Sequence, residues 1–202
     1  MFDKSQKTEA PILKMVHLQN CKVLPQRFNL LQKLPKNAVG AEIGVLGGDW
    51  SAKLIKHTEP EKLILIDTFC SNDYPHHNRF TKKTHFDFIK KRFEEHSFVE
   101  CVQGISWDCM KVYPENYFDW IYIDAAHDYG SVKKDLKEAI KVLKRNGIII
   151  LNDYIMYDHF TKEEYGVVQA TNEFLIENDY EMLYLALHPN MFCDLLIKKR
   201  VV

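Results

Sequence analysis

Two aspartates in this chain stand where carboxylates could act together. Asp124 ends the apolar run Trp120–Ile123, and Asp153 follows the apolar run Gly147–Leu151. If these runs are neighbouring parallel strands, about 4.8 Å apart, their carboxyl ends bring the two side chains together. Close carboxylates raise each other's pKa, so the pair needs a divalent metal, a basic partner or a shared proton. Oxygen ligands favour Mg²⁺, Mn²⁺ or Ca²⁺ over zinc, which makes Asp124 and Asp153 candidate metal ligands.

His127 lies three residues past Asp124, in the same predicted loop. Histidine is the side chain best suited to proton transfer near neutral pH. A single loop histidine is more often a surface residue, so its position beside Asp124 is what singles it out. We therefore predict His127, Asp124 and Asp153 as catalytic residues, with His159 as a weaker second histidine.

A glycine-rich turn follows the apolar run Val39–Ile43. Gly44, Gly47 and Gly48 would let a ligand approach the backbone, at the outward-pointing N–H groups of the next helix. The turn has neither the dinucleotide fingerprint GxGxxG nor the Gly-Lys-Ser/Thr ending of a P-loop. Three glycines preceded by the acid Glu42 therefore indicate a binding turn of another kind.

Two more strand ends belong to the same edge. Asp67 ends the run Lys62–Ile66, where a carboxylate can accept hydrogen bonds from both ribose hydroxyls of an adenosine-type cofactor. A helix cap or loop aspartate is an equally good interpretation of Asp67 alone. Gln103–Ser106 follows the run Phe98–Val102 and could contact an adenine edge through backbone groups.

The elements that position these residues alternate between strand and helix. Helical periodicity predicts helices over Trp50–His57, Thr81–Glu95, Ser106–Val112, Ser131–Lys144 and Val167–Glu177. Such alternation indicates an open, doubly wound α/β sheet of five parallel strands with right-handed crossovers. The last two β-rich runs, Glu181–Leu187 and Phe192–Lys198, are joined by four residues, too few for a crossover, so we predict an antiparallel hairpin.

We predict that this domain covers residues 35–202. An N-terminal extension, residues 1–34, precedes it and contains a short helix over Pro25–Leu34. With 27 basic and 28 acidic residues the net charge is -1, which argues against nucleic-acid or anionic-membrane partners. No apolar run is long enough to span a membrane. The five cysteines are odd in number and scattered, which indicates reduced thiols and a cytoplasmic protein.

Taken in order, these motifs resemble class I S-adenosylmethionine-dependent methyltransferases. Within that class the chain resembles the methyltransferase domain 24 group, which is related to macrolide sugar O-methyltransferases. The matching stretches are Ala41–Ser51, Ile66–Phe69, Ile123–Leu136, Gly147–Tyr154 and Gly166–Glu173. One departure concerns a metal: Asn152 stands where relatives often have histidine, which puts the third ligand of a metal site in question.

The resemblance implies a Rossmann-like, seven-stranded sheet, S-adenosylmethionine as cofactor, and methyl transfer to a hydroxyl of a sugar or small metabolite. The proton of that hydroxyl would leave to His127, or with the help of Mg²⁺ on Asp124 and Asp153. The implied cofactor-binding residues are Glu42, Gly44, Gly48, Asp67, Gly104, Ile105, Ser106 and Asp124. Residues 70–79 and 155–165 would be substrate lids.

The partners implied are a small-molecule or glycan substrate and neither nucleic acid nor membrane. A homodimer stays open. The competing interpretation is a non-catalytic module that binds S-adenosylmethionine or S-adenosylhomocysteine. Such a module would have no use for Asp124, His127 and Asp153, so their presence favours an enzyme.

Overall fold

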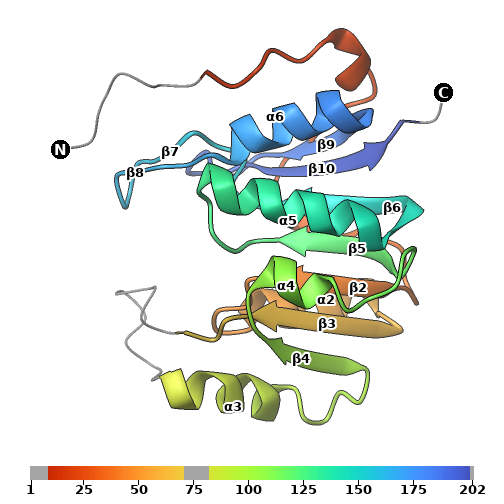
Figure 1. The fold of residues 1–202 in the computed structure, drawn as a ribbon, viewed down its shortest axis with the longest axis vertical. Helices are drawn as coiled ribbons and strands as arrows, with labels where there is room; N and C mark the ends of the chain where they lie inside the picture. The colour runs from red at the N-terminus through yellow and green to blue at the C-terminus, as the bar shows by residue number, and fades with distance from the viewer. Residues whose placement is uncertain (1–8, 71–81, 201–202) are drawn as a thin grey trace.

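The structure, a computed structural model, describes residues 9–70 and 82–200 (Figure 1). Its helices are η1 (Met15–His17), α1 (Phe28–Leu31), α2 (Asp49–Thr58), α3 (Lys82–Arg92), α4 (Ser106–Met110), α5 (Tyr129–Val142) and α6 (Val167–Asn178). Its strands are β1 (Lys22–Leu24), β2 (Val39–Ile43), β3 (Lys62–Asp67), β4 (Val99–Gln103), β5 (Phe118–Ile123), β6 (Leu143–Leu151), β7 (Tyr157–Asp158), β8 (Glu163–Glu164), β9 (Tyr180–Ala186) and β10 (Asp194–Lys199).

The large sheet has the strand order β1-β9-β10-β6-β5-β2-β3-β4. Strands β2 to β6 are mutually parallel, and β9 and β10 form an antiparallel hairpin with β10 against β6. The predicted doubly wound fold is therefore confirmed. The sheet has eight strands where the resemblance implied seven, because Lys22–Leu24 adds a parallel strand to β9, with Lys22 opposite Tyr184.

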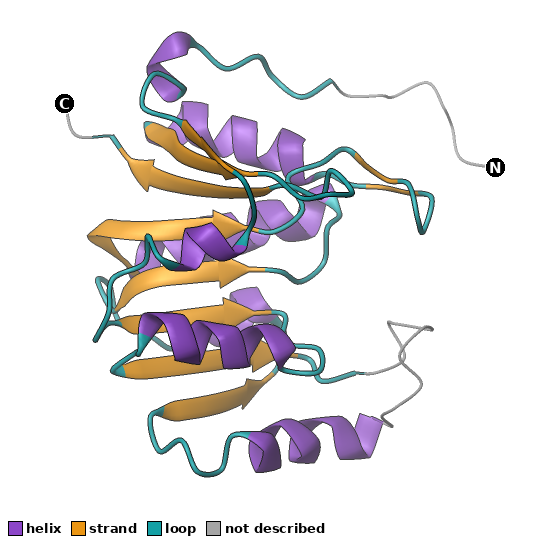
Figure 2. Cartoon of the chain, turned by 180° about the vertical axis from the view of Figure 1, so that it is seen from behind, coloured by secondary structure: helices purple, strands orange, loops and turns teal. Residues whose placement is uncertain are grey.

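Both faces of the sheet are covered by helices (Figure 2). Strand β3 illustrates how the sequence achieves this, because neighbouring side chains of a strand point to opposite faces. Leu63 and Leu65 pack in a core with residues of α1, α2 and α3, whereas Ile64 and Ile66 pack in a second core with residues of α4, α5 and α6. A strand buried on both faces has to be apolar throughout, as this one is.

The N-terminal segment packs on the domain that follows it. Leu30, Leu31 and Leu34 are buried in the same core as Leu63 and Leu65. The short predicted helix is present as α1. The proposed division of the chain at residue 34 stays a prediction.

The end of α5 differs from the sequence expectation of a helix reaching Lys144. The helix stops at Val142, because Leu143 already pairs with Phe118 as the first residue of β6. Most of the first predicted lid, residues 71–79, lies outside the described residues. The second, residues 155–165, contains the small β7–β8 hairpin, which lies at the same side as the arrowheads of β3 and β5 (Figure 1). Across the described ranges, no helix is long and apolar enough to cross a membrane.

The direction in which successive strands are added to the sheet reverses between β2 and β5. From β2 the chain continues outward to β3 and β4, and then returns to place β5 on the other side of β2. In open α/β sheets ligands bind in the crevice at such a switch point, beyond the carboxyl ends of the strands. The candidate site is therefore at the ends of β2 and β5.

Candidate active site

The carboxyl ends of five parallel strands meet at one edge of the sheet. Just beyond the last paired residues, four more backbone hydrogen bonds link neighbouring strands. These bonds, of 2.7–2.9 Å, run from the N–H of Asn152 to Ile123, of Asp124 to Ile43, of Gly44 to Ile66 and of Gly104 to Asp67. The residues predicted from separate motifs are thus brought to one edge.

Gly44 is required by the close approach of two backbones. Its φ is +86°, and an added Cβ would lie 1.8 Å from the carbonyl oxygen of Asp124. Gly48, with φ +77°, faces Phe93, the residue that follows α3, whereas an added Cβ at Gly47 would meet nothing within 4 Å. The sequence predicted that a ligand could approach the backbone at all three glycines. The structure leaves space for such an approach at Gly47.

Glu42 lies on β2 below this turn and is buried, with 1% of its surface exposed. Its Oε2 atom has no hydrogen-bond partner among the described residues. Burial raises the pKa of Glu42 well above its usual range. A buried carboxyl oxygen without a partner is unfavourable, so this atom is a place where a cationic or hydrogen-bonding ligand group would be stabilised.

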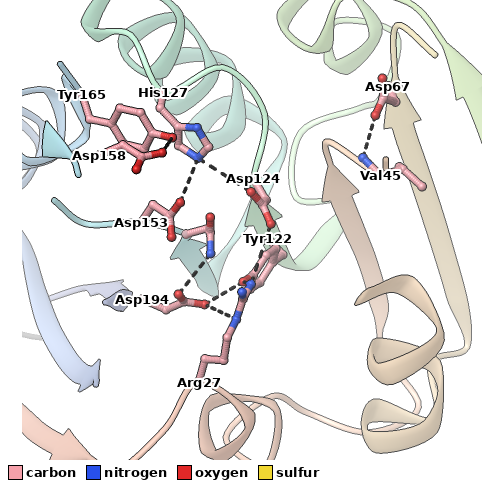
Figure 3. Close-up of polar contacts among 11 residues, drawn as sticks. Arg27, Val45, Asp67, Tyr122, Asp124, His127, Asp153, Asp158, Tyr165 and Asp194 are labelled. Carbon is pink, nitrogen blue, oxygen red and sulfur yellow. Dashed lines mark hydrogen bonds and ion pairs between the residues drawn. The ribbon is translucent and has the colours of Figure 1, made fainter. Parts of the chain in front are cut away.

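Asp67 uses its carboxylate to fix the glycine turn. One oxygen accepts the backbone N–H groups of Val45, at 2.7 Å (Figure 3), and of Leu46, at 3.2 Å. The other accepts that of Phe69 at 2.7 Å. Leu46 and Phe69 both have positive φ, a conformation that such bonds help to stabilise. The structure thus gives Asp67 a structural role at this turn, and its predicted contact with ribose stays a prediction.

The third predicted cofactor segment, Gly104–Ser106, leads into α4. Ile105 is exposed, while the hydroxyl of Ser106 donates to the carboxyl of Asp135 at 2.5 Å. Asp135 lies on α5 and is fully buried, and burial raises its pKa to about 7. The side chain of Ser106 is therefore used within the protein, which leaves the backbone of this segment for a ligand.

Asp124 and Asp153 lie on either side of His127. The imidazole Nε2 is 3.7 Å from Oδ1 of Asp124 and 3.9 Å from Oδ2 of Asp153, as Figure 3 shows. The predicted proximity of the two carboxylates is confirmed, and the nitrogen of the predicted base lies between them. That nitrogen is buried and makes no hydrogen bond within the described structure.

The surroundings of His127 hold its ring in one orientation. Its imidazole stacks on the Tyr165 ring, with 4.5 Å between centroids and 3° between planes. The Tyr165 hydroxyl in turn donates to Asp158 at 3.2 Å. Asp153 has a φ of 52°, unusual for a residue with a side chain, and such strain is concentrated at functional sites.

A cation from the N-terminal segment completes the group. Arg27, which precedes α1, lies 3.8 Å from Asp124 and 3.4 Å from Asp194, and donates to the Tyr122 hydroxyl at 2.6 Å. Asp194, the fully buried first residue of β10, accepts from that hydroxyl at 2.7 Å and from the amide of Asn152 at 3.1 Å. One arginine therefore faces several carboxylates.

The protonation of this group follows from its burial. Burial raises the pKa of Asp124 to about 6, against the opposing effect of Arg27. Burial, with repulsion from Asp124 and Asp194, raises the pKa of Asp153 to about 7. Burial also lowers the pKa of His127, so the imidazole is neutral near neutral pH. A neutral imidazole beside partly protonated carboxyls can accept or pass on a proton.

The residues do not fit the divalent metal predicted for Asp124 and Asp153. The described ranges contain no group of three or more His, Cys, Asp or Glu side chains arranged to hold an ion. The His127 nitrogen lies between the two carboxylates, and Arg27 provides positive charge beside Asp124. Of the three ways to stabilise such a pair, the structure thus supplies the basic partner, and we derive no step through a metal.

Several residues of the site were missed by sequence reasoning. Arg27 lies in the segment treated as an extension, and Asp194 begins a hairpin strand that was noted only for its apolar character. The sequence pattern shows Tyr122 only as one apolar residue of a strand. The alternation of β5, in which Trp120 and Tyr122 share a face, would have placed the Tyr122 hydroxyl beside the same edge.

A doubly wound sheet with a C-terminal antiparallel hairpin, a glycine turn after its central strand and acids at the neighbouring strand ends defines a class I S-adenosylmethionine-dependent methyltransferase. The profile of a methyltransferase domain family, methyltransferase domain 24, matches residues 41–154, and the chain belongs to this family. No curated protein matches the sequence.

Solved structures share this fold at low sequence identity. An O-methyltransferase from Bacillus cereus, solved with S-adenosylhomocysteine, is 17% identical with a TM-score of 0.60, covering 86% of this chain and 78% of its own. The tRNA methyltransferase TrmK of B. subtilis is 16% identical, with a TM-score of 0.57 and coverages of 88% and 67%. Spermidine synthase from Thermotoga maritima is 16% identical, with a TM-score of 0.58 and coverages of 88% and 62%. These likenesses concern the fold.

Proposed function

We propose that this methyltransferase transfers the methyl group of S-adenosylmethionine to a hydroxyl oxygen of a sugar or another small metabolite. The observation that carries this proposal is the Asp124–His127–Asp153 group, which lies at the strand ends beside the glycine turn. A hydroxyl acceptor loses a proton during the transfer, and this group is built to accept one. The O-methyltransferase among the structural neighbours agrees with it.

The features of the β2 end support S-adenosylmethionine as the cofactor. The unpartnered Oε2 of buried Glu42 suits the cationic amino group of the methionine part, and the open side of Gly47 allows close approach to the turn. Asp67 would share its carboxylate between the turn and the ribose, and the backbone of Gly104–Ser106 would face the adenine. When bound, the cofactor supplies a methyl group whose bond to sulfur breaks as the bond to the acceptor oxygen forms.

The residues of this chain have two tasks in that reaction. They orient the acceptor, which is the leading contribution when the donor is already activated. They also take the hydroxyl proton: Nε2 of neutral His127 accepts it, and the imidazolium that results lies within 4 Å of the carboxylates of Asp124 and Asp153, which stabilise its charge. Stacking on Tyr165 keeps the accepting nitrogen in place.

The β7–β8 hairpin and the β9–β10 loop support a role in acceptor binding. The rings of Phe160 and Phe192, one from each segment, stack with 5.7 Å between centroids, and His159 packs on both. Phe160 is 65% exposed, as an acceptor-contacting ring would be before binding. All five cysteines are free thiols, which agrees with the cytoplasmic location that we propose.

Calorimetry with S-adenosylmethionine and S-adenosylhomocysteine, with and without Mg²⁺, tests the cofactor. A panel of hydroxylated sugars and metabolites, followed by mass spectrometry for a methyl addition, then tests the transfer. Methylation of a hydroxyl without added metal is expected. Binding of the cofactor with no product from any acceptor would favour the non-catalytic binding module, and methylation at nitrogen would contradict the oxygen-directed part of the proposal.

A further inference from the structure

We propose that Arg27 binds the carboxylate of the methionine part of S-adenosylmethionine. The inference rests on the proposed function, because it adds a residue to the same cofactor site. Arg27 precedes α1 and lies outside residues 41–154, the stretch that matches the family profile. The assignment therefore comes from the position and chemistry of its guanidinium group.

The guanidinium group of Arg27 bridges the switch-point crevice. Its carbon lies 4.0 Å from the ring centroid of Trp50, in the first turn of the helix that follows β2. Its Nη2 atom lies 3.8 Å from the carboxylate of Asp124, at the end of β5. Strands β2 and β5 are neighbours whose chain connections diverge, so Arg27 spans the place where ligands of this sheet type bind.

The charges at this edge leave one group of the cofactor in need of a cation. Glu42, Asp124 and Asp153 offer oxygen acceptors to the amino group and the sulfonium, which are positive, whereas the cofactor's carboxylate needs N–H donors or a cation. Arg92, which contacts the glycine turn, is another cation that could bind that carboxylate. It is already engaged, because its guanidinium donates to the Gly47 carbonyl and to Asp49, the latter at 2.7 Å.

Arg27 has N–H donors left for a carboxylate. A guanidinium carries five such donors, and the described structure shows one hydrogen bond from this group, to the Tyr122 hydroxyl. Its Nε lies 3.4 Å from Asp194 without forming a hydrogen bond. With 24% of its surface exposed, the Arg27 side chain is partly accessible to a ligand. Such a fork can bind a carboxylate through two parallel bonds.

The contacts that Arg27 already makes prepare it for this role. Packing on Trp50 and the bond to Tyr122 fix the plane of the guanidinium before any ligand arrives. A side chain that is ordered in advance loses less entropy on binding. The N-terminal segment is thus part of the cofactor site in this proposal.

The test compares two ligands that differ by one group: S-adenosylhomocysteine and its decarboxylated analogue, both measured by calorimetry on the full chain. The unmodified protein should bind S-adenosylhomocysteine about 10- to 100-fold more tightly than the analogue. Arg27→Gln should reduce this preference to about 3-fold or less while the affinity for the analogue changes little. Arg27→Lys, which keeps the charge without the fork, should give an intermediate preference.

Arg200→Gln is the matched control. Arg200 is 23% exposed and forms an ion pair with Asp179 at 2.5 Å, just after the last residue of β10 at the opposite edge of the sheet. Its replacement should leave the preference unchanged. Because the preference is a ratio of two affinities on one sample, a partly unfolded fraction does not alter it.

Among the variants, three results would overturn the inference: a preference that survives Arg27→Gln, an equal weakening of both ligands by Arg27→Gln, or a loss of preference in Arg92→Gln in place of Arg27→Gln. The equal weakening would assign Arg27 a purely structural role. If the unmodified protein binds neither ligand, the proposed function itself fails, and the inference fails with it. If it binds both equally, the inference alone fails.

Discussion

The β3 end and the β5–β6 end of the site use carboxylates in different ways. At the β3 end, Asp67 accepts three backbone N–H groups and shapes the glycine turn. At the β5–β6 end, Asp124 and Asp153 face one imidazole nitrogen and have raised pKa values, mainly because of burial. Acids at equivalent strand ends thus fix the shape of a turn at one end and, in the function we propose, assist proton transfer at the other.

The largest effect is expected at the β5–β6 end, where His127 lies between Asp124 and Asp153. His127→Ala should lower turnover about 10²- to 10⁴-fold, because the hydroxyl proton loses its acceptor. Cofactor affinity should stay within a few-fold, since none of the proposed cofactor contacts is made by the His127 side chain. Steady-state kinetics on an acceptor from the panel, with calorimetry for the cofactor, measures both.

His159→Ala is the control for that experiment, since His159 packs on Phe160 and Phe192 instead of lying between carboxylates. If turnover dropped more for His159→Ala than for His127→Ala, the general base would be His159 on the β7–β8 hairpin. The proposed difference between the β3 end and the β5–β6 end would then be wrong.

Substitutions in the glycine turn should change the stability of the protein. Gly44→Ala places a Cβ 1.8 Å from the Asp124 carbonyl oxygen at a φ of +86°, so we expect a loss of about 3 kcal/mol or more in the free energy of unfolding. Gly47→Ala is the matched control, because an added Cβ there meets nothing within 4 Å. Urea titrations of the two variants give the comparison, and equal stability would contradict the close approach of the two strand ends.

The titration of Asp153 predicts a pH-dependent stability. Burial, with repulsion from Asp124, raises the folded-state pKa of Asp153 to about 7, above the unfolded value of about 4. The contribution of Asp153 to the stability of the folded state is therefore complete below about pH 4 and is lost as the pH rises through 7. Relative to the unmodified protein, Asp153→Asn should gain up to about 4 kcal/mol in the free energy of unfolding as the pH rises from about 4 to about 7.

Asp158→Asn provides a control of opposite sign. Although burial opposes it, hydrogen bonds from Phe160 and Thr161 lower the pKa of Asp158. Its contribution is present above the unfolded pKa and lost as the pH falls through the folded one. The free energy of unfolding of Asp158→Asn should therefore decrease relative to that of the unmodified protein as the pH rises. If Asp153→Asn and Asp158→Asn both gained or both lost stability with rising pH, the opposite pKa shifts assigned to these two residues would be refuted.

The smallest effect concerns Asp67. Asp67→Asn keeps one carbonyl oxygen as acceptor and removes the charge, so we expect a loss of about 1–2 kcal/mol in unfolding free energy. If the ribose prediction also holds, affinity for S-adenosylhomocysteine will drop beyond what the unfolded fraction explains, while 5′-linked analogues without ribose hydroxyls will bind as before. Unchanged stability would show that the turn does not depend on the carboxylate.

The sequence was sufficient for features that depend on neighbours in the chain or on adjacent strands. Apolar runs such as Leu63–Ile66 identified the parallel strands, and the shared edge of parallel strands brought Asp124, His127 and Asp153 together. Arg27 and Asp194 could not be predicted, because they reach the site from α1 and β10, which adjoin it only through tertiary packing. The three-residue strand β1 was missed because it is too short to show alternation.

The pairing of β1 with β9 also has a consequence for the order of assembly. Lys22 emerges early in synthesis, but its partner Tyr184 is made near the end of the chain, so this pairing has to wait. Contacts between such distant residues form late, because a long loop must close first. Arg27 follows β1 directly and its partner Asp194 begins β10. A nascent chain would therefore contain Arg27, the glycine turn and His127 well before Asp194 is made, and Arg27 would be held in its place at the site only once the final strands have paired.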